Sequence, residues 1–266
     1  MIRGGFVAAC VLAISGTAHA ISGSVTGCMV FDDPRLGCCT GEPGCHFNTC
    51  GGNGQDQPFK EARVALVAWW GEPGSGTTDS NGCFNFSWND ASCLGPTCTY
   101  TLRLFAQNPN DFTVMNTSGA TYSASSSVTI RSGATPLGAL QPVDSTAEKW
   151  GLYATSQQFF DRIVDQSSVL SATMTDIDVV YPVAANETFA PGDHTVNIGI
   201  GVANGRPFGV AHELGHLANR HAFGEAIFDY QGCTNAHEWY AVHPCERVPF
   251  EEGFAWFWSV PWGWSN

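Results

Sequence analysis

Ten of the eleven cysteines fall into two groups, and this distribution limits how the chain can fold. Eight of them lie between residues 28 and 98, and two, Cys233 and Cys245, lie in the last third of the chain. Both groups are even in number, so each part of the chain can pair its own cysteines as disulfides. We therefore expect two domains, with the connectivity among the first eight cysteines left open.

The first 20 residues have the composition of a secretory signal. Arg3 precedes an apolar run from Phe6 to Ile14, and Ala18-His19-Ala20 provides the small residues of a cleavage site. Cys10 would be removed with this segment. We expect an exported protein, secreted or periplasmic, in a compartment where disulfides persist. No later stretch has the roughly 18 consecutive apolar residues that a membrane span requires.

The chain is acidic, with a formal net charge of −13. This charge repels the phosphate backbone of nucleic acids, so we expect no nucleic-acid partner. The hydrophobic content of 44% is ordinary for a globular protein and argues against extended disorder. Neither number indicates an oligomeric state.

Residues 21–142 have the pattern of an all-β domain. Short runs rich in β-branched and aromatic residues alternate with clusters of Gly, Pro, Asn and Asp. We expect strands at residues 24–25, 62–70, 83–88, 100–106 and 127–130. The Gly- and Cys-rich residues 32–58 have no strand pattern, and disulfides would have to hold them in place.

Three stretches of this domain, at residues 62–67, 77–86 and 100–104, resemble the carboxypeptidase-regulatory-like family. The resemblance covers about residues 21–107 and implies a small transthyretin-type β-sandwich with a structural or adhesive role. Within it, the residues from Asp79 to Gly82 suit a tight turn, and Phe84 and Phe86 are expected to point to one face of the next strand.

Residues 143–266 follow a different pattern, which predicts an α+β domain. Ser145 and Glu148 form a capping box, and apolar residues continue at helical spacing to about residue 165. Strands are expected at residues 177–181 and 195–200. A second helix is expected over residues 208–222, with Pro207 in its first turn and Gly224 as its cap.

The second helix contains the pentad His212-Glu213-Leu214-Gly215-His216. His212 and His216 lie one helical turn apart, so both imidazoles can reach one metal ion. Glu213 lies beside the first ligand and can approach a water on the metal without binding the metal itself. The pattern therefore predicts a catalytic zinc site, with Glu213 as the general base.

With this pentad at the end of a helix–strand–strand–helix order, the second domain resembles the zincin metallopeptidases. In that superfamily the strand before the active-site helix forms the rim along which an extended substrate binds, which implies residues 195–200 here. The stretch Pro249-Phe250-Glu251-Glu252-Gly253-Phe254-Ala255 resembles the Glu-Gly-Phe-Ala helix of gluzincins. The resemblance implies that Glu252 is the third zinc ligand, with Gly253 permitting a close approach of the two helices.

Three other residues compete with Glu252 for the third ligand position: Glu251, Asp229 and His221. His221 is nine residues from His212, which places it roughly on the opposite face of the helix. The donor that stabilises the developing oxyanion is not identified by any motif, and Tyr240 and His243 are the leading candidates. Four tryptophans near the end of the chain, at positions 256, 258, 262 and 264, are expected to pack against the active-site helix.

Together these patterns predict a signal peptide (1–20), a disulfide-rich β-sandwich (21–142) and a minimal gluzincin-like α+β domain (143–266). The expected function is that of a secreted zinc metallopeptidase, which hydrolyses peptide bonds in a peptide or protein substrate with His212, His216 and Glu252 as zinc ligands. Two alternatives remain. One is an exported adhesion or binding protein with a degenerate zincin domain, and the other is a zinc hydrolase acting on a non-peptide amide.

Overall fold

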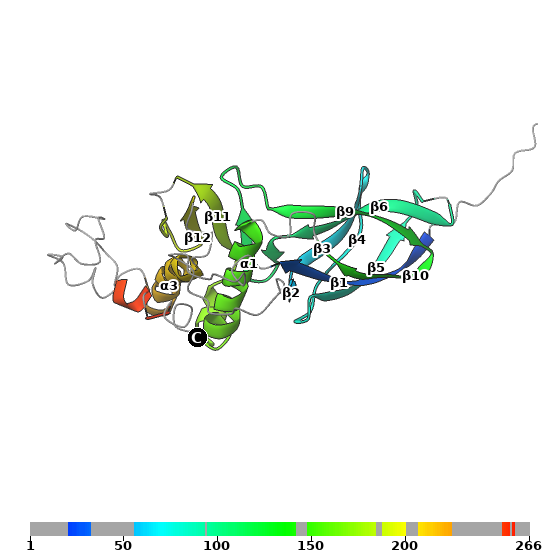
Figure 1. Cartoon of the computed structure of the whole chain (residues 1–266). Helices are drawn as coiled ribbons and strands as arrows, with labels where there is room; N and C mark the ends of the chain where they lie inside the picture. Colours follow the sequence, from blue (N-terminus) through cyan, green and yellow to red (C-terminus); the bar gives the residue numbers. More distant parts are fainter. Residues whose placement is uncertain are drawn as a thin grey trace, which may run out of the picture.

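Three four-stranded sheets make up most of the structure, a computed structural model that is rich in β-strand (Figure 1). The structure describes residues 21–32, 56–93, 95–141, 148–184, 188–200, 207–224, 252–255 and 257–258.

The first sheet is built around β1 (Ile21–Asp32). On one side β10 (Gly133–Leu140) runs parallel to it. On the other side β5 (Cys83–Asp90) and the short β2 (Asp56–Pro58) pair with it in antiparallel fashion, one after the other along its length. Cys28 and Cys83 lie directly opposite each other in this ladder and form a disulfide.

The second sheet is antiparallel and has the order β4 (Gly71–Thr77), β3 (Arg63–Ala68), β6 (Thr97–Phe105) and β9 (Ser123–Arg131). It packs face to face against the first sheet. Alternate residues of β5 are buried between them, and the ring of Trp88 lies 5.9 Å from that of Tyr100. Phe84 and Phe86 are both buried on this inner face, as their spacing predicts.

A second disulfide, Cys93–Cys98, closes the turn between β5 and β6. The expectation of disulfides is therefore confirmed for four cysteines. The other six predicted to pair lie outside the described residues: Cys38, Cys39, Cys45, Cys50, Cys233 and Cys245.

The third sheet combines strands from both sides of the boundary predicted between residues 142 and 143. Its order is β12 (Thr195–Gly199), β11 (Ile177–Val183), β8 (Phe112–Met115) and β7 (Gln107–Asn108). Both β8 and β12 run parallel to β11. The β7–β8 hairpin therefore extends away from the first two sheets and supplies two of the four strands of the third sheet, which α3 contacts through β12.

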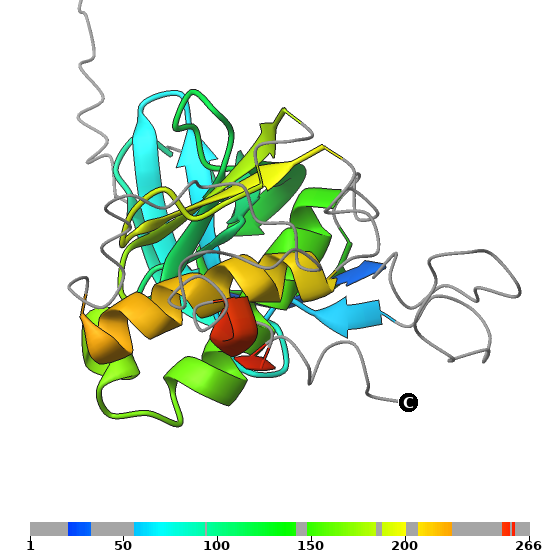
Figure 2. The same ribbon diagram turned by 90° about the vertical axis from the view of Figure 1, so that its left-hand side faces the viewer.

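The helices pack beside this third sheet. They are α1 (Glu148–Phe159), a π-helical turn that continues it (Phe160–Val164), α2 (Leu170–Thr173) and α3 (Pro207–Phe223). α1 and α3 contact each other on the same side of the sheet (Figure 2). The helices expected from the capping box and from the pentad are confirmed. Gly224, with φ +78°, caps α3 by donating its N–H to the carbonyl of Arg220 at 2.8 Å.

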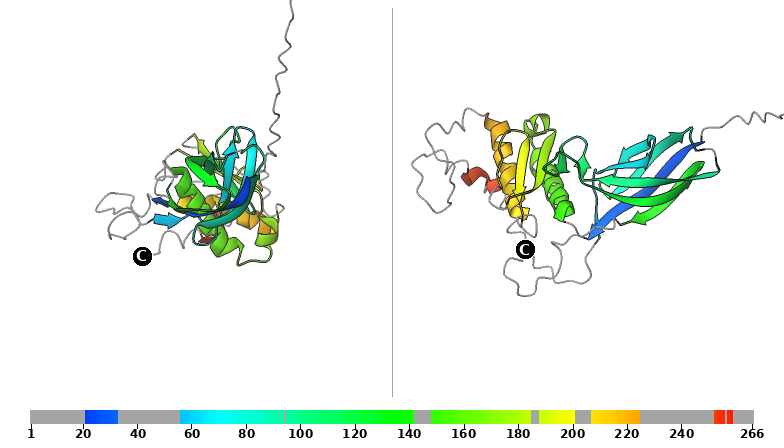
Figure 3. Two further views of the ribbon diagram at one scale, coloured as in Figure 1. Left: turned by 90° about the vertical axis from the view of Figure 1, so that its right-hand side faces the viewer. Right: turned by 90° about the horizontal axis from the view of Figure 1, so that it is seen from above.

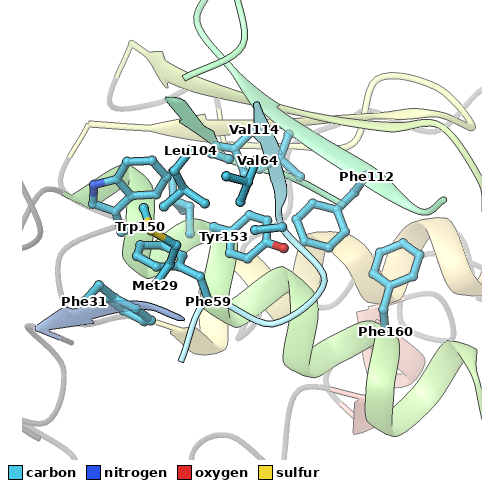
Figure 4. Packing of buried hydrophobic residues seen from close by; sticks show 14 of the residues in the cluster. Met29, Phe31, Phe59, Val64, Leu104, Phe112, Val114, Trp150, Tyr153 and Phe160 are labelled. Carbon is cyan, nitrogen blue, oxygen red and sulfur yellow. The ribbon is translucent and has the colours of Figure 1, made fainter. Parts of the chain in front are cut away.

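One hydrophobic core connects the three sheets and the helices, from Val25 in β1 to Ala218 in α3. The first two sheets lie toward one end of the molecule, and the third sheet with α1 and α3 lies toward the other (Figure 3). The junction is aromatic: Phe59 packs on Trp150 and Tyr153 of α1, and Tyr153 packs on Phe112 of β8 (Figure 4). This burial fixes α1, and through it α3, against the β-sheets.

No helix among the described residues has both the length and the apolar composition needed to cross a bilayer.

A polar cluster borders the aromatic junction. The side-chain amide of Asn108 donates to the carboxylates of Glu61 and Asp111, and that of Gln157 donates to Glu61 and Asp161. Burial raises the pKa of Asp111 from 3.8 to about 6, and the negative charges of Asp165, Glu61 and Asp161 add to the increase, while the hydrogen bond from Asn108 opposes it.

Asp111 should make the protein more stable at mildly acidic pH. Between about pH 4 and 6 the folded state holds a proton on Asp111 that the unfolded chain has released, so the free energy of unfolding falls as pH rises through this range. The expected loss is on the order of 1 kcal/mol, because solvent screens the half-buried carboxyl. Urea unfolding at pH 4.5 and 7 should show this difference, and Asp111→Asn should reduce it. An equal pH dependence in both proteins would contradict this assignment.

Candidate metal centre

Helix α3 carries the two histidines and the glutamate of the pentad. Its apolar residues face the core, where Val210, Ala211, Leu214 and Leu217 are buried. The remaining positions leave polar side chains on two adjacent faces. At about 100° per residue, His212, His216 and Asn219 share one face, whereas Glu213 and Arg220 share the next one.

The first of these faces meets a helical segment at residues 252–255 and 257–258, drawn in red against α3 in Figure 2. Here Nε2 of His212 lies 3.2 Å from Nε2 of His216 and 3.2 Å from Oε2 of Glu252, and Nε2 of His216 lies 3.6 Å from Oε1 of Glu252. The ligand atoms of the three residues all lie within 4.8 Å of one another. Two imidazoles and one carboxylate thus converge on one point from two helices.

These separations fit a metal ion bound by all three residues. Ligand bonds of about 2.0–2.1 Å in tetrahedral geometry place neighbouring donor atoms about 3.3 Å apart. Two imidazole nitrogens and one carboxylate oxygen are also a donor set that suits Zn²⁺ and leaves one coordination position for another group. The described residues therefore contain a possible metal-binding group.

Gly215 allows the second helical segment to approach α3. A Cβ atom at this position would lie only 3.1 Å from both Cα and O of Ala255, and 3.3 Å from Cβ of Trp258. At Gly253, by contrast, a Cβ atom would meet nothing within 4 Å. The expectation that Gly253 permits the close approach is therefore wrong. The glycine inside the pentad does so, because the contact is made on the face of α3 and not at the start of the partner helix.

Gly215→Ala should weaken metal binding without altering any ligand. The added methyl group would push the 252–258 segment, and Glu252 with it, away from the histidines, at a cost of about 1–3 kcal/mol in stability. We expect an approximately tenfold weaker affinity for zinc in a chelator-competition titration. Gly253→Ala is the matched control and should bind zinc as the unaltered chain does. Equal affinities for the two variants would argue against this packing.

Trp258 binds the 252–258 segment to α3 through a hydrogen bond. Its indole N–H donates to Oδ1 of Asn219 at 3.1 Å, and its ring packs at the edge of the core next to the buried Ala255. The expectation that the terminal tryptophans pack against the pentad helix is confirmed for Trp258. The other three lie outside the described residues.

Glu213 is buried beside the metal-binding group, with 8% of its surface exposed. Burial raises the pKa of its carboxyl group, and the negative charge of Glu252 acts in the same direction. The positive charges of Arg220 and of His216 and His212, when protonated, oppose the increase. A carboxylate with a raised pKa next to metal-ligand candidates is suited to accept and return a proton.

The rim of the third sheet differs from the expectation. The zincin resemblance implies residues 195–200 as the rim strand, but the outer edge of β12 is already hydrogen-bonded at Asn197 and Gly199. Phe189 pairs with Asn197 through backbone hydrogen bonds of 2.8 and 3.1 Å, and the hydroxyl of Thr188 accepts a 2.8 Å hydrogen bond from the Gly199 amide. The outermost described segment is therefore residues 188–190, which run antiparallel to β12. Because residues 188–190 form only this one bridge with β12, their sequence has no strand pattern from which the pairing could be predicted.

Of the rival third ligands, only His221 lies within the described residues. Its Nε2 is 2.8 Å from the carbonyl oxygen of Asp193, and its ring packs edge-on against His194, so it is not part of the metal-binding group. Glu251 and Asp229 lie outside the described residues, as do the two candidates for the oxyanion donor, Tyr240 and His243.

Comparison with known proteins leaves the family of this chain open. No family model matches it, and no curated protein does. Among solved structures, a 9R-lipoxygenase from Cyanothece PCC8801 aligns over 53% of this chain and 23% of its own length, with 15% sequence identity and a TM-score of 0.24. A likeness this low carries no argument about fold or function.

Proposed function

We propose that this chain is an exported zinc-dependent metallopeptidase of the gluzincin type. The observation that carries the proposal is the convergence of His212, His216 and Glu252 on one point, with the buried carboxylate of Glu213 beside them. The order α1, β11, β12, α3 and the glutamate supplied by a separate helical segment support the gluzincin resemblance. The two disulfides support export.

In this proposal His212, His216 and Glu252 hold Zn²⁺. When bound, the ion would lower the pKa of a water toward 7 and polarise the scissile carbonyl. Glu213 takes a proton from the attacking water and then delivers it to the departing amine, so that one carboxyl group serves as base and as acid. Burial of Glu213 aids the second step, since a raised pKa favours holding the proton between the two transfers. Tyr240 or His243 would donate to the developing oxyanion.

The first two sheets take no part in this chemistry. In the proposal they form a carboxypeptidase-regulatory-like β-sandwich, which supports the catalytic part through the aromatic junction at Phe59, Trp150 and Tyr153. The described residues assigned to the reaction lie in α3 and in the segment at residues 252–255, outside these two sheets.

Cleavage of a diverse peptide library, read by mass spectrometry, tests the proposal. We expect cleavage by the chain that begins at residue 21, loss of cleavage with a zinc chelator, and recovery when zinc is restored. A zinc-loaded, folded chain that cleaves no peptide would contradict the proposal. Cleavage of non-peptide amides by that chain would instead support the hydrolase alternative, and absence of both activities would support a binding protein.

A further inference from the structure

The second polar face of α3 carries a contact that the proposed chemistry does not use. Glu213 and Arg220 are seven residues apart, so they lie two turns from each other along this face. Nη1 of Arg220 donates to the carbonyl oxygens of Ala190 at 2.9 Å and Gly192 at 2.7 Å. One guanidinium nitrogen carries two N–H groups, and here each of them has one carbonyl acceptor.

The residues that Arg220 binds belong to the segment that borders β12. We call residues 188–193 the rim segment. At its start, Thr188 and Phe189 are hydrogen-bonded to Gly199 and Asn197 of β12. At its end, the carbonyl of Asp193 contacts the ring of His221. The rim segment is thus held by β12 on one side and by the last turn of α3 on the other.

These contacts connect the rim segment to the helix that carries the metal ligands. Its only ladder contact among the described residues is the bridge at Phe189, and a single bridge is easily opened. Arg220 adds two charge-assisted hydrogen bonds, which are stronger than neutral ones. Arg220 and Glu213 lie on the same face of α3, so the hydrogen bonds from Arg220 connect the rim segment to the helix that carries the general base.

We propose that Arg220 is a positioning residue for the metal centre: by binding the carbonyls of residues 190 and 192, it holds the rim segment at a fixed place relative to Glu213 and the two histidines. We call the two hydrogen bonds from Arg220 to the carbonyls of residues 190 and 192 the clamp, and its existence does not depend on the proposed function. Its consequence for substrate rests on the proposed function: an extended peptide would bind along the rim segment, which lies outside β12 and takes the place of residues 195–200 as the edge of the sheet. An arginine suits this task because its rigid, planar fork fixes the direction of both hydrogen bonds, whereas lysine offers a point charge on a flexible stem.

Amide hydrogen exchange tests the clamp independently of any activity. The amides of Asn197 and Gly199 report on the rim segment, because they donate to Phe189 and Thr188, and the amide of the buried Leu217 reports on α3 as a whole. In zinc-loaded Arg220→Met we expect exchange at Asn197 and Gly199 to be about tenfold faster or more, with exchange at Leu217 and zinc content unchanged. Arg220→Lys should show a smaller effect, and Arg131→Met, in β9, is the control that should show none.

Unchanged exchange at Asn197 and Gly199 in Arg220→Met would overturn the proposal. Equal acceleration at Leu217 would do so too, because it would indicate a general structural role. If Arg220→Met does not fold, Arg220→Lys decides by the same comparison of amides.

Steady-state kinetics with peptide substrates test the effect of Arg220 on substrate binding, and they distinguish failure of this proposal from failure of the proposed function. For extended peptides we expect Arg220→Lys to raise KM about tenfold while kcat changes less than about threefold, since Glu213 and the ligands stay in place. A change confined to kcat would overturn the positioning role. If exchange accelerates as expected but the unaltered chain cleaves no peptide, the clamp stands and the peptidase proposal fails.

Discussion

Replacing Glu213 by glutamine should lower kcat/KM for peptide cleavage by about 10³-fold, the middle of the range for a general acid–base residue. Glutamine keeps the shape of the side chain but cannot take the proton from water. Zinc binding should persist, because the proposed ligands His212, His216 and Glu252 are unchanged. The measurement is steady-state cleavage of the best library peptide, together with the zinc content of each sample.

Glu148→Gln, in the first turn of α1, is the matched control for this substitution and should retain full activity. Its carboxylate is far along the chain from the pentad and is not among the metal-binding residues. Glu213→Gln with at least half of the original activity would show that another group accepts the proton. That result would remove the pentad glutamate from the mechanism.

His212→Ala should abolish stoichiometric zinc binding. Residues that merely orient a metal ligand cost about 10–100-fold in affinity when replaced, so loss of a ligand should cost more than about 100-fold. The two ligands that remain, His216 and Glu252, are fewer than the three or four protein ligands that hold zinc in proteins. Zinc content after dialysis, measured by mass spectrometry, should fall from about one ion per chain to a small fraction of that.

His221→Ala supplies a control on the same helix. His221 contacts the carbonyl of Asp193 and is not part of the metal-binding group, so its replacement should leave the zinc content unchanged. If His221→Ala lost zinc while His212→Ala kept it, the ligand assignment would be wrong.

Local patterns in the sequence predict most of the helices and strands. The pentad helix was expected at residues 208–222 and extends over Pro207–Phe223, because Pro207 and Gly224 mark its ends and its apolar residues repeat at helical spacing. The strands β3, β5, β6, β11 and β12 were indicated by β-branched and aromatic runs between turn residues. These signals reside within a few neighbouring residues.

Contacts between distant residues explain what the sequence did not predict. Pairing of β8 with β11 joins residues more than 60 positions apart, and no local pattern specifies such a parallel register. The choice between Gly215 and Gly253 as the point of close approach depends on how two helices cross. The sequence does not predict the rim segment or the role of Arg220, because one bridge and two hydrogen bonds to backbone carbonyls produce no periodic pattern of apolar residues.

The ligand set was predicted from the sequence only with help from the gluzincin resemblance. Spacing alone joins His212 to His216, since one helical turn separates them. Glu252 is 36 residues beyond His216, and only the folded chain shows their side chains 3.6 Å apart. The position of His221, bonded to Asp193, agrees with the helical angle that separates it from His212.

Titration of the metal-free chain with zinc, followed by peptide cleavage at each step, tests the central claim most directly. We predict that activity rises linearly and stops rising at one zinc per chain, and that Glu213→Gln binds the same amount of zinc without gaining activity. A chain that takes up one zinc, remains folded and cleaves no peptide at any step would contradict the claim that this centre is a peptidase site.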